Sequence, residues 1–306
     1  MITSGDQKQN THTGKVVSHV PGHDIIDCQN CGFLHVSPLP TEAELTKLYQ
    51  QDFYQSEKPE YIAASEQDGA WHDIEYGLRL DLAHEHLGHA GKVLDIGCGP
   101  GNFLQVARKQ GWDAYGIEPS SVAADHAKSL GLDVQTGFFP DDFNHEAGSF
   151  DFIHMSEVLE HVPSPTEVIQ AAKQLLRPDG VLTISVPNDF SPLQMAAAKA
   201  VSADQWWVVP DHHLNYFTMD SLEKILRAQC LTCIDRTTNF PMELFLLMGQ
   251  DYTADPAIGK QCHQLRKKFD QNLNQIDKDL LKKFYRHLAG INMGRLAIIT
   301  AQNGSE

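Results

Sequence analysis

Short apolar runs alternate with longer amphipathic stretches along the middle of the chain. Such runs, separated by segments in which apolar side chains recur every three or four positions, are typical of parallel strands joined by crossover helices. The pattern predicts a doubly wound α/β fold with strands at 92–96, 113–117, 133–136, 150–154 and 181–186.

Helices are predicted from apolar spacing and from capping residues. Ile74, Leu78 and Leu82 recur every four positions, which favours a helix over 71–87. The run Ser164-Pro165-Thr166-Glu167 combines a capping serine, a proline at the first helical position and a glutamate three residues after the cap, so another helix should follow it. Further helices are expected at 42–50, from 102 onward, at 219–229 and, as a pair, within 257–289.

Strands at 231–236 and 296–299 would place the helical pair as an insertion between two strands of one sheet. The apolar segment 239–248 and this insertion predict either a substrate cap or a homodimer face. The expected organisation is a flexible tail (1–18), an N-terminal extension (19–70), a ligand-binding core (71–240), the helical cap or dimerisation insertion (241–290) and a last strand with its tail (291–306).

Composition narrows the class of protein. With 306 residues, 42% apolar residues and a formal net charge of −16, the chain suits a folded enzyme but not a body that binds nucleic acid through a basic face. No apolar stretch reaches the roughly 18 residues of a membrane span, and the first residues lack the pattern of a secretory signal. Six cysteines without a regular framework favour free thiols, so we expect a cytoplasmic protein.

A glycine-rich loop follows the first strand of the core. Gly97, Gly99 and Gly101 stand at alternate positions after Asp95, and Glu118 closes the next strand, where a carboxylate can accept both ribose hydroxyls of an adenosine. Dinucleotide enzymes usually space these glycines as G-x-G-x-x-G, whereas this spacing favours a compact nucleoside without phosphate. A nicotinamide-dependent oxidoreductase and a glycine-rich turn without ligand are the alternatives.

These residues, the segment 150–162 and the turn Leu176-Arg177-Pro178-Asp179-Gly180 resemble class I S-adenosylmethionine-dependent methyltransferases, closest to the group that includes the ubiquinone-biosynthesis O-methyltransferases. The resemblance covers about 75–236 and implies a Rossmann-like sheet of seven strands and S-adenosyl-L-methionine as cofactor. It implies that Gly97 and Gly99 approach the methionine part, that Glu118 holds the ribose, and that the cofactor site also includes Arg79, Asp95, Cys98, Gly101, Asn102, Phe103, Pro119, Gly137, Phe138, Met155, Ser156 and Glu157.

Two groups of residues past the later strands are candidates for catalysis, because a histidine suits proton transfer near neutral pH. His161 follows one strand, and His212, His213 and Tyr216 follow the next. The resemblance also implies a divalent metal near Glu157, Glu160 and His161. The alternatives are that Glu160 and His161 brace the following helix and that His212 and His213 are packed and bonded to backbone. Trp206 and Trp207 would either wall a substrate pocket or belong to the core.

The N-terminal extension contains Cys28 and Cys31, with His19 and His23 upstream, and these four residues are of types that zinc accepts as ligands. The segment resembles the N-terminal part of methyltransferases of natural-product and cell-surface sugar pathways, which often have two Cys-x-x-Cys pairs; the first pair is missing here.

The leading hypothesis is a methyltransferase that acts on a small-molecule acceptor such as a sugar, a phenol or a natural-product intermediate. A non-catalytic scaffold that binds S-adenosylmethionine is the alternative from another class.

Overall fold

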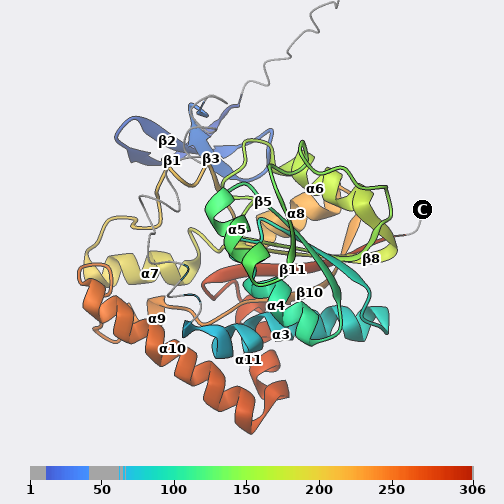
Figure 1. The fold of residues 1–306 in the computed structure, drawn as a ribbon. Helices are drawn as coiled ribbons and strands as arrows, with labels where there is room; N and C mark the ends of the chain where they lie inside the picture. Colours follow the sequence, from blue (N-terminus) through green and yellow to red (C-terminus); the bar gives the residue numbers. More distant parts are fainter. Residues whose placement is uncertain (1–11, 41–61, 63–64, 66, 305–306) are drawn as a thin grey trace, which may run out of the picture.

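Seven strands form the main sheet, in the order β10-β11-β8-β7-β4-β5-β6. The protein is described by a computed structural model that covers residues 12–40, 62, 65 and 67–304 (Figure 1). The strands are β4 (Lys92–Ile96), β5 (Asp113–Glu118), β6 (Asp133–Thr136), β7 (Phe150–Ser156), β8 (Leu176–Pro187), β10 (Leu231–Thr237) and β11 (Leu296–Asn303). The first five run parallel, and β11 lies antiparallel between β8 and β10. The predicted doubly wound α/β fold and all seven predicted strands are confirmed.

Helices cover both faces of this sheet because its strands are apolar on both sides. Leu94 and Ile153 pack with α6 and α8, whereas Val93 and Phe152 pack with α3, α4 and α5. The helices are α3 (Gly69–Leu87), α4 (Asn102–Lys109), α5 (Ser121–Ser129), α6 (Pro165–Leu175), α7 (Pro192–Val201) and α8 (Met219–Ala228). This two-sided packing aligns the carboxyl ends of the parallel strands along one edge, where ligands bind in such sheets.

A second, small sheet was not predicted. It has the order β1-β2-β3-β9 and joins β1 (Gly14–Val20), β2 (His23–Cys28) and β3 (Leu34–Ser37) to β9 (Asn215–Tyr216) of the distant chain. The predicted tail over 1–18 was therefore wrong for residues 14–18, which belong to β1. This strand is mostly exposed and is held by backbone pairing with β2, so its sequence carries little apolar signal.

The insertion consists of α9 (Glu243–Leu247), α10 (Pro256–Ile276) and α11 (Lys278–Gly290), so the predicted helical pair between two strands of the same sheet is confirmed. Its apolar residues pack against Ile74 and Leu78 of α3, and Trp71 donates a hydrogen bond of 2.8 Å to Asp270 Oδ2. Figure 1 shows α10 and α11 at the opposite end of the molecule from the small sheet. The substrate cap and the dimer face stay predictions.

The helix predicted at 42–50 lies outside the described residues. Among the helices that the structure describes, none combines the length and the apolar character needed to cross a membrane.

Candidate functional site

A cavity of about 610 Å³ opens at the carboxyl ends of β4, β5, β6 and β7. Its volume lies in the range of small-molecule sites, and it lies where the strand order reverses, between β4 and β7. Of the residues predicted from sequence, it is lined by Gly97, Glu118, Pro119, Gly137, Phe138, Glu157 and His161. The loops that follow these four strands therefore bring their residues to one cavity.

The glycine loop is shaped by two close approaches. Gly97 has a φ of +71°, and a Cβ there would lie 2.5 Å from Val158 Cγ2, so a side chain would collide with the loop after β7. Gly101 has a φ of +89°, and its Cβ would lie 2.3 Å from Leu132 Cδ1. Gly97 thus keeps the cavity open, whereas Gly101 lets the start of α4 pack close to α5 and to Leu132, which follows α5.

Glu118 is held at the cavity by two backbone donors. Gly99 N–H donates to Oε2 at 2.8 Å and Ser120 N–H donates to Oε1 at 2.9 Å. Each carboxylate oxygen has a second lone pair, so the group can still accept two hydrogen bonds from a ligand in the cavity. Burial raises the pKa of Glu118 to about 7, although the two N–H groups oppose this shift.

This pKa predicts how binding depends on pH. The ionised carboxylate, which accepts hydrogen bonds best, predominates above pH 7 and is lost as the pH falls below it. If only the ionised form binds a ribose diol, the dissociation constant of S-adenosylhomocysteine rises about tenfold for each pH unit below 7. Calorimetric titration between about pH 5.5 and 8 measures this. Glu118→Gln should bind more weakly with no such slope; an equal slope in both proteins would contradict the assignment.

Several predicted cofactor residues lie behind the cavity instead of lining it. Asp95 Oδ1 lies 2.7 Å from His154 Nδ1, and Arg79 Nη1 lies 2.9 Å from His154 Nε2. Because Arg79 only donates, His154 Nε2 accepts and Nδ1 donates to Asp95. Arg79 also donates to Ser156 Oγ at 3.3 Å. This buried network supports the loop from below, and the predicted contacts of these residues with the cofactor stay predictions.

The remaining predicted cofactor residues have structural contacts. Phe103 stacks on His154, with ring centroids 3.9 Å apart, and Met155 is fully buried in the main core. Cys98 N–H donates to Ile117 O at 3.2 Å, and Asn102 Nδ2 donates to Ser65 Oγ. Phe139 and Asp142 line the cavity and were missed, because nothing in their local spacing marks the loop after β6 as part of a site.

A second group lies at the other end of the cavity. The ligand atoms of Glu160, His161 and His213 all lie within 4.8 Å of one another. His161 Nδ1 donates to His212 O at 2.7 Å, which leaves Nε2 as the acceptor, 3.9 Å from Glu160 Oε1. The backbone of 214–215 donates to Glu160 O, and Asn215 Nδ2 donates to Leu159 O and Val162 O. The two loops that carry the candidates are therefore fixed to each other.

Glu160 has the most unusual environment of this group. It is 1% exposed, and neither carboxylate oxygen has a hydrogen-bond partner from another described residue. Burial, with the nearby Glu157 carboxylate, raises the pKa of Glu160 well above its usual range. A buried carboxyl without donors is costly, so the position favours a protonated carboxyl or a cation at this point.

Tyr216 and the two tryptophans belong to packed regions. Tyr216 is 1% exposed within the core of the small sheet, and its hydroxyl accepts a hydrogen bond from Val209 N–H at 3.1 Å. The predicted catalytic role of Tyr216 is not supported by this placement, because it does not line the cavity. Trp207 is buried against Phe190, and Trp206 contacts Trp207 and Tyr252. Trp207 therefore matches the core alternative, whereas Trp206 is half-buried, and neither lines the cavity.

The predicted zinc ligands need a correction. Cys28 and Cys31 do lie close together, but His19 and His23 are not with them. In the hairpin register Val20 pairs with His23, His19 pairs with Asp24 and Gly14 pairs with Cys28, so the two histidines lie at the turn, roughly 13–16 Å along the strand from Cys28. His19 Nδ1 instead lies 2.7 Å from Asp24 Oδ1. The residues beside the cysteines are His12 and His35.

Comparison with known proteins identifies the class. Residues 68–235, more than half of the chain, match a family described as "Methyltransferase domain". The chain therefore belongs to this family, the class I S-adenosylmethionine-dependent methyltransferases.

Two relatives show which methyltransferases this chain is similar to. A ubiquinone biosynthesis O-methyltransferase of Actinobacillus pleuropneumoniae serotype 7 is 41% identical over 123 residues, which are 36% of this chain and 53% of the relative. The protein of that name from Xanthomonas axonopodis pv. citri is 32% identical over 159 residues, 47% of this chain and 65% of the relative. The matches span about half to two thirds of these relatives, so their activity does not transfer to the whole chain.

A solved structure supports the fold over nearly the full length. The 1,6-didemethyltoxoflavin-N1-methyltransferase of Burkholderia thailandensis, with bound 1,6-didemethyltoxoflavin and S-adenosylhomocysteine, has a TM-score of 0.54 and 18% identity. The alignment covers 95% of this chain and 100% of that protein. The predicted Rossmann-like fold is confirmed, whereas this likeness says nothing about the acceptor.

Proposed function

We propose that the chain transfers the methyl group of S-adenosylmethionine to a hydroxyl of a small phenolic acceptor. The observation that carries the proposal is the position of Glu118, whose carboxylate is held at the cavity by two backbone donors and keeps lone pairs for a ribose diol. The same cavity extends to Glu157 and His161, so donor and acceptor have room side by side.

The donor would lie across the ends of three strands. Glu118 would accept the ribose hydroxyls, Phe138 and Phe139 would contact the adenine, and the open backbone at Gly97 would admit the methionine part. Arg79, Asp95 and Ser156 would act through the loop that they support.

The acceptor hydroxyl would be activated by His161. Its Nδ1–H donates to the His212 carbonyl, so the lone pair of the ring is on Nε2, which would take the hydroxyl proton. The oxygen lone pair then forms a bond to the methyl carbon while the carbon–sulfur bond breaks, and its electron pair stays on sulfur to give S-adenosylhomocysteine. The sulfonium is already activated, so alignment of the two groups supplies much of the rate.

A divalent metal is the alternative way to activate the hydroxyl, because a metal bound at His161 Nε2 would occupy the lone pair that otherwise takes the proton. Glu160, His161 and His213 offer one carboxylate and two imidazoles within 4.8 Å, and the buried Glu160 oxygens accept no hydrogen bond from other described residues. A cation bound by these residues would lower the pKa of a phenolic hydroxyl beside it.

Tritiated S-adenosylmethionine tests this function. We expect label in catechol, a phenol with two adjacent hydroxyls, or in the small-molecule fraction of a cell extract, and calorimetry should show binding of S-adenosylhomocysteine but not of NADH. Binding without transfer would favour the scaffold, tight binding of NADH alone would favour the oxidoreductase, and label in protein or nucleic acid would contradict a small acceptor.

A further inference from the structure

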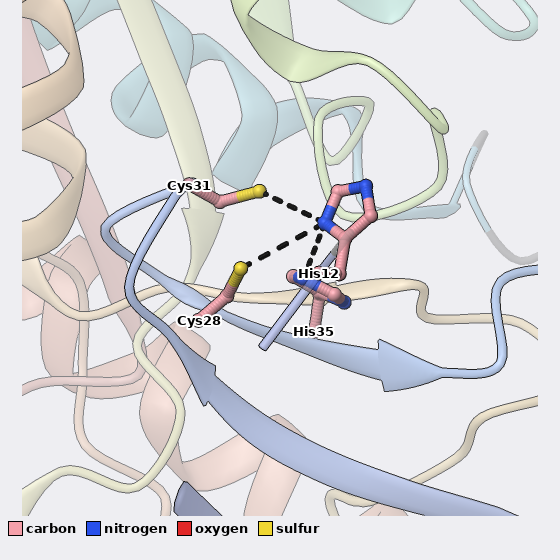
Figure 2. Close-up of side chains that lie close together, drawn as sticks. All are labelled: His12, Cys28, Cys31 and His35. Carbon is pink, nitrogen blue, oxygen red and sulfur yellow. Dashed lines mark hydrogen bonds between the residues drawn. The ribbon is translucent and has the colours of Figure 1, made fainter. Parts of the chain in front are cut away.

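Four side chains at the small sheet point toward one another, and none of them belongs to the group of Glu160, His161 and His213 (Figure 2). His12 precedes β1, Cys28 ends β2, Cys31 lies in the turn that follows, and His35 lies on β3. Their ligand atoms all lie within 4.8 Å of one another, and two of the four residues are buried. Backbone pairing of three strands thus gathers ligands that are 23 positions apart in the chain.

His12 Nδ1 has more close neighbours than it can satisfy by hydrogen bonding. This nitrogen lies 3.1 Å from His35 Nε2, 3.4 Å from Cys31 Sγ and 3.7 Å from Cys28 Sγ. A ring nitrogen has either one hydrogen or one lone pair, so it satisfies one of these neighbours and not three. Tetrahedral zinc with bonds of about 2.05 Å to nitrogen and 2.3 Å to sulfur separates its ligands by roughly 3.3 Å for two nitrogens and 3.6 Å for nitrogen and sulfur.

The ring of His35 and the turn that carries the two cysteines are both oriented for metal binding. His35 Nδ1 donates to Val36 O at 2.7 Å, so the buried ring presents the lone pair of Nε2 to the cluster. Gly32, with a φ of +79°, donates to Cys28 O at 2.9 Å and closes the turn that brings both thiols to the same side.

We propose that His12, Cys28, Cys31 and His35 form a structural zinc site. Two thiolates and two imidazoles in a closed set of four suit mononuclear zinc. A cluster with two irons would not fit, because one nitrogen of His12 lies within 3.7 Å of both sulfurs.

The site would fix the small sheet beside the methyl-transfer machinery. His35 pairs with Asn215 in the register of β3 and β9, and Asn215 holds the loop that carries Glu160 and His161. Phe33, two residues after Cys31, packs on Phe217 with ring centroids 5.0 Å apart. The zinc would therefore tie an exposed hairpin to the core near the acceptor end of the cavity.

Metal analysis of the full chain tests the site. Protein exposed to Zn²⁺ under a phosphine reductant and then dialysed should retain one zinc that His12→Ala and Cys31→Ser lose, both positions being only half-buried. His19→Ala and Cys230→Ser, exposed residues outside the cluster, should retain it. With Co²⁺, thiolate-to-metal charge transfer and tetrahedral d–d bands should appear in the wild type and the two controls only.

The cysteine variant and the thiolate band distinguish this zinc site from the cluster of Glu160, His161 and His213. Metal held by Glu160, His161 and His213 would persist in Cys31→Ser and would give no thiolate band. A reduced wild type without zinc, or unchanged zinc in both cluster variants, overturns the proposal. S-adenosylhomocysteine binding by the same samples reports on the donor site, so failure of the zinc site leaves the proposed function untouched.

Discussion

Replacement of Glu118 by alanine should weaken the binding of S-adenosylhomocysteine by about 100-fold or more, because hydrogen bonds to a charged group are worth about 1.5–3 kcal/mol each and two would be lost. The effect should be this large because the carboxylate is 5% exposed, and water does not easily replace it. Isothermal titration of wild type and variant measures the ratio.

A matched control distinguishes recognition from damage to the fold. Asp133→Ala removes an exposed carboxylate from the first position of the adjacent β6, and it should leave the affinity within about threefold. The Glu118 variant also leaves Gly99 N–H and Ser120 N–H without their acceptor, so its melting temperature must be measured. A folded variant that binds as tightly as wild type would remove Glu118 from the donor site.

The main sheet could be predicted from sequence because its physical causes are local. A buried parallel strand must be apolar on both faces, as at 92–96 and 150–154, and the capping residues around Ser164 mark the start of α6. The small sheet could not be predicted in this way, because β1 is exposed and β9 has two residues. The hairpin of β1 and β2 is local, but β9 joins the sheet only by pairing with β3, as His35 pairs with Asn215 far along the chain.

The residues of the candidate site were likewise predictable where their position along a strand decides their role, and not where the role depends on the fold. Glu118 and Gly97 follow from their positions at strand ends, and both line the cavity. Asp95 is also near a strand end, and Arg79 is implied by the resemblance, yet both contact His154 in a buried network, and only the fold shows which face of β7 His154 occupies. For the metal ligands, Cys31-x3-His35 was a usable local signal, whereas His12 joins the cluster only through the hairpin.

Replacement of His161 by alanine should lower the turnover of catechol by at least about 100-fold, the usual contribution of a positioned general base, with the affinity for S-adenosylhomocysteine unchanged within about threefold. The reason is that His161 lines the cavity and presents Nε2, while the donor residues lie toward β5 and β6. Initial rates with tritiated donor, together with calorimetry, measure both quantities. His84→Ala, an exposed histidine in the last turn of α3, should behave as wild type.

A second variant shows whether His161 acts alone or with its neighbours. If Glu160, His161 and His213 act as a unit, the loss of turnover in His161→Ala combined with His213→Ala should be no larger than in His161→Ala, because groups that work together are not additive. If the losses multiply, His213 contributes separately and the metal interpretation fails. Equal losses of turnover and donor affinity in His161→Ala would instead indicate that this histidine braces the loop before α6 and takes no proton.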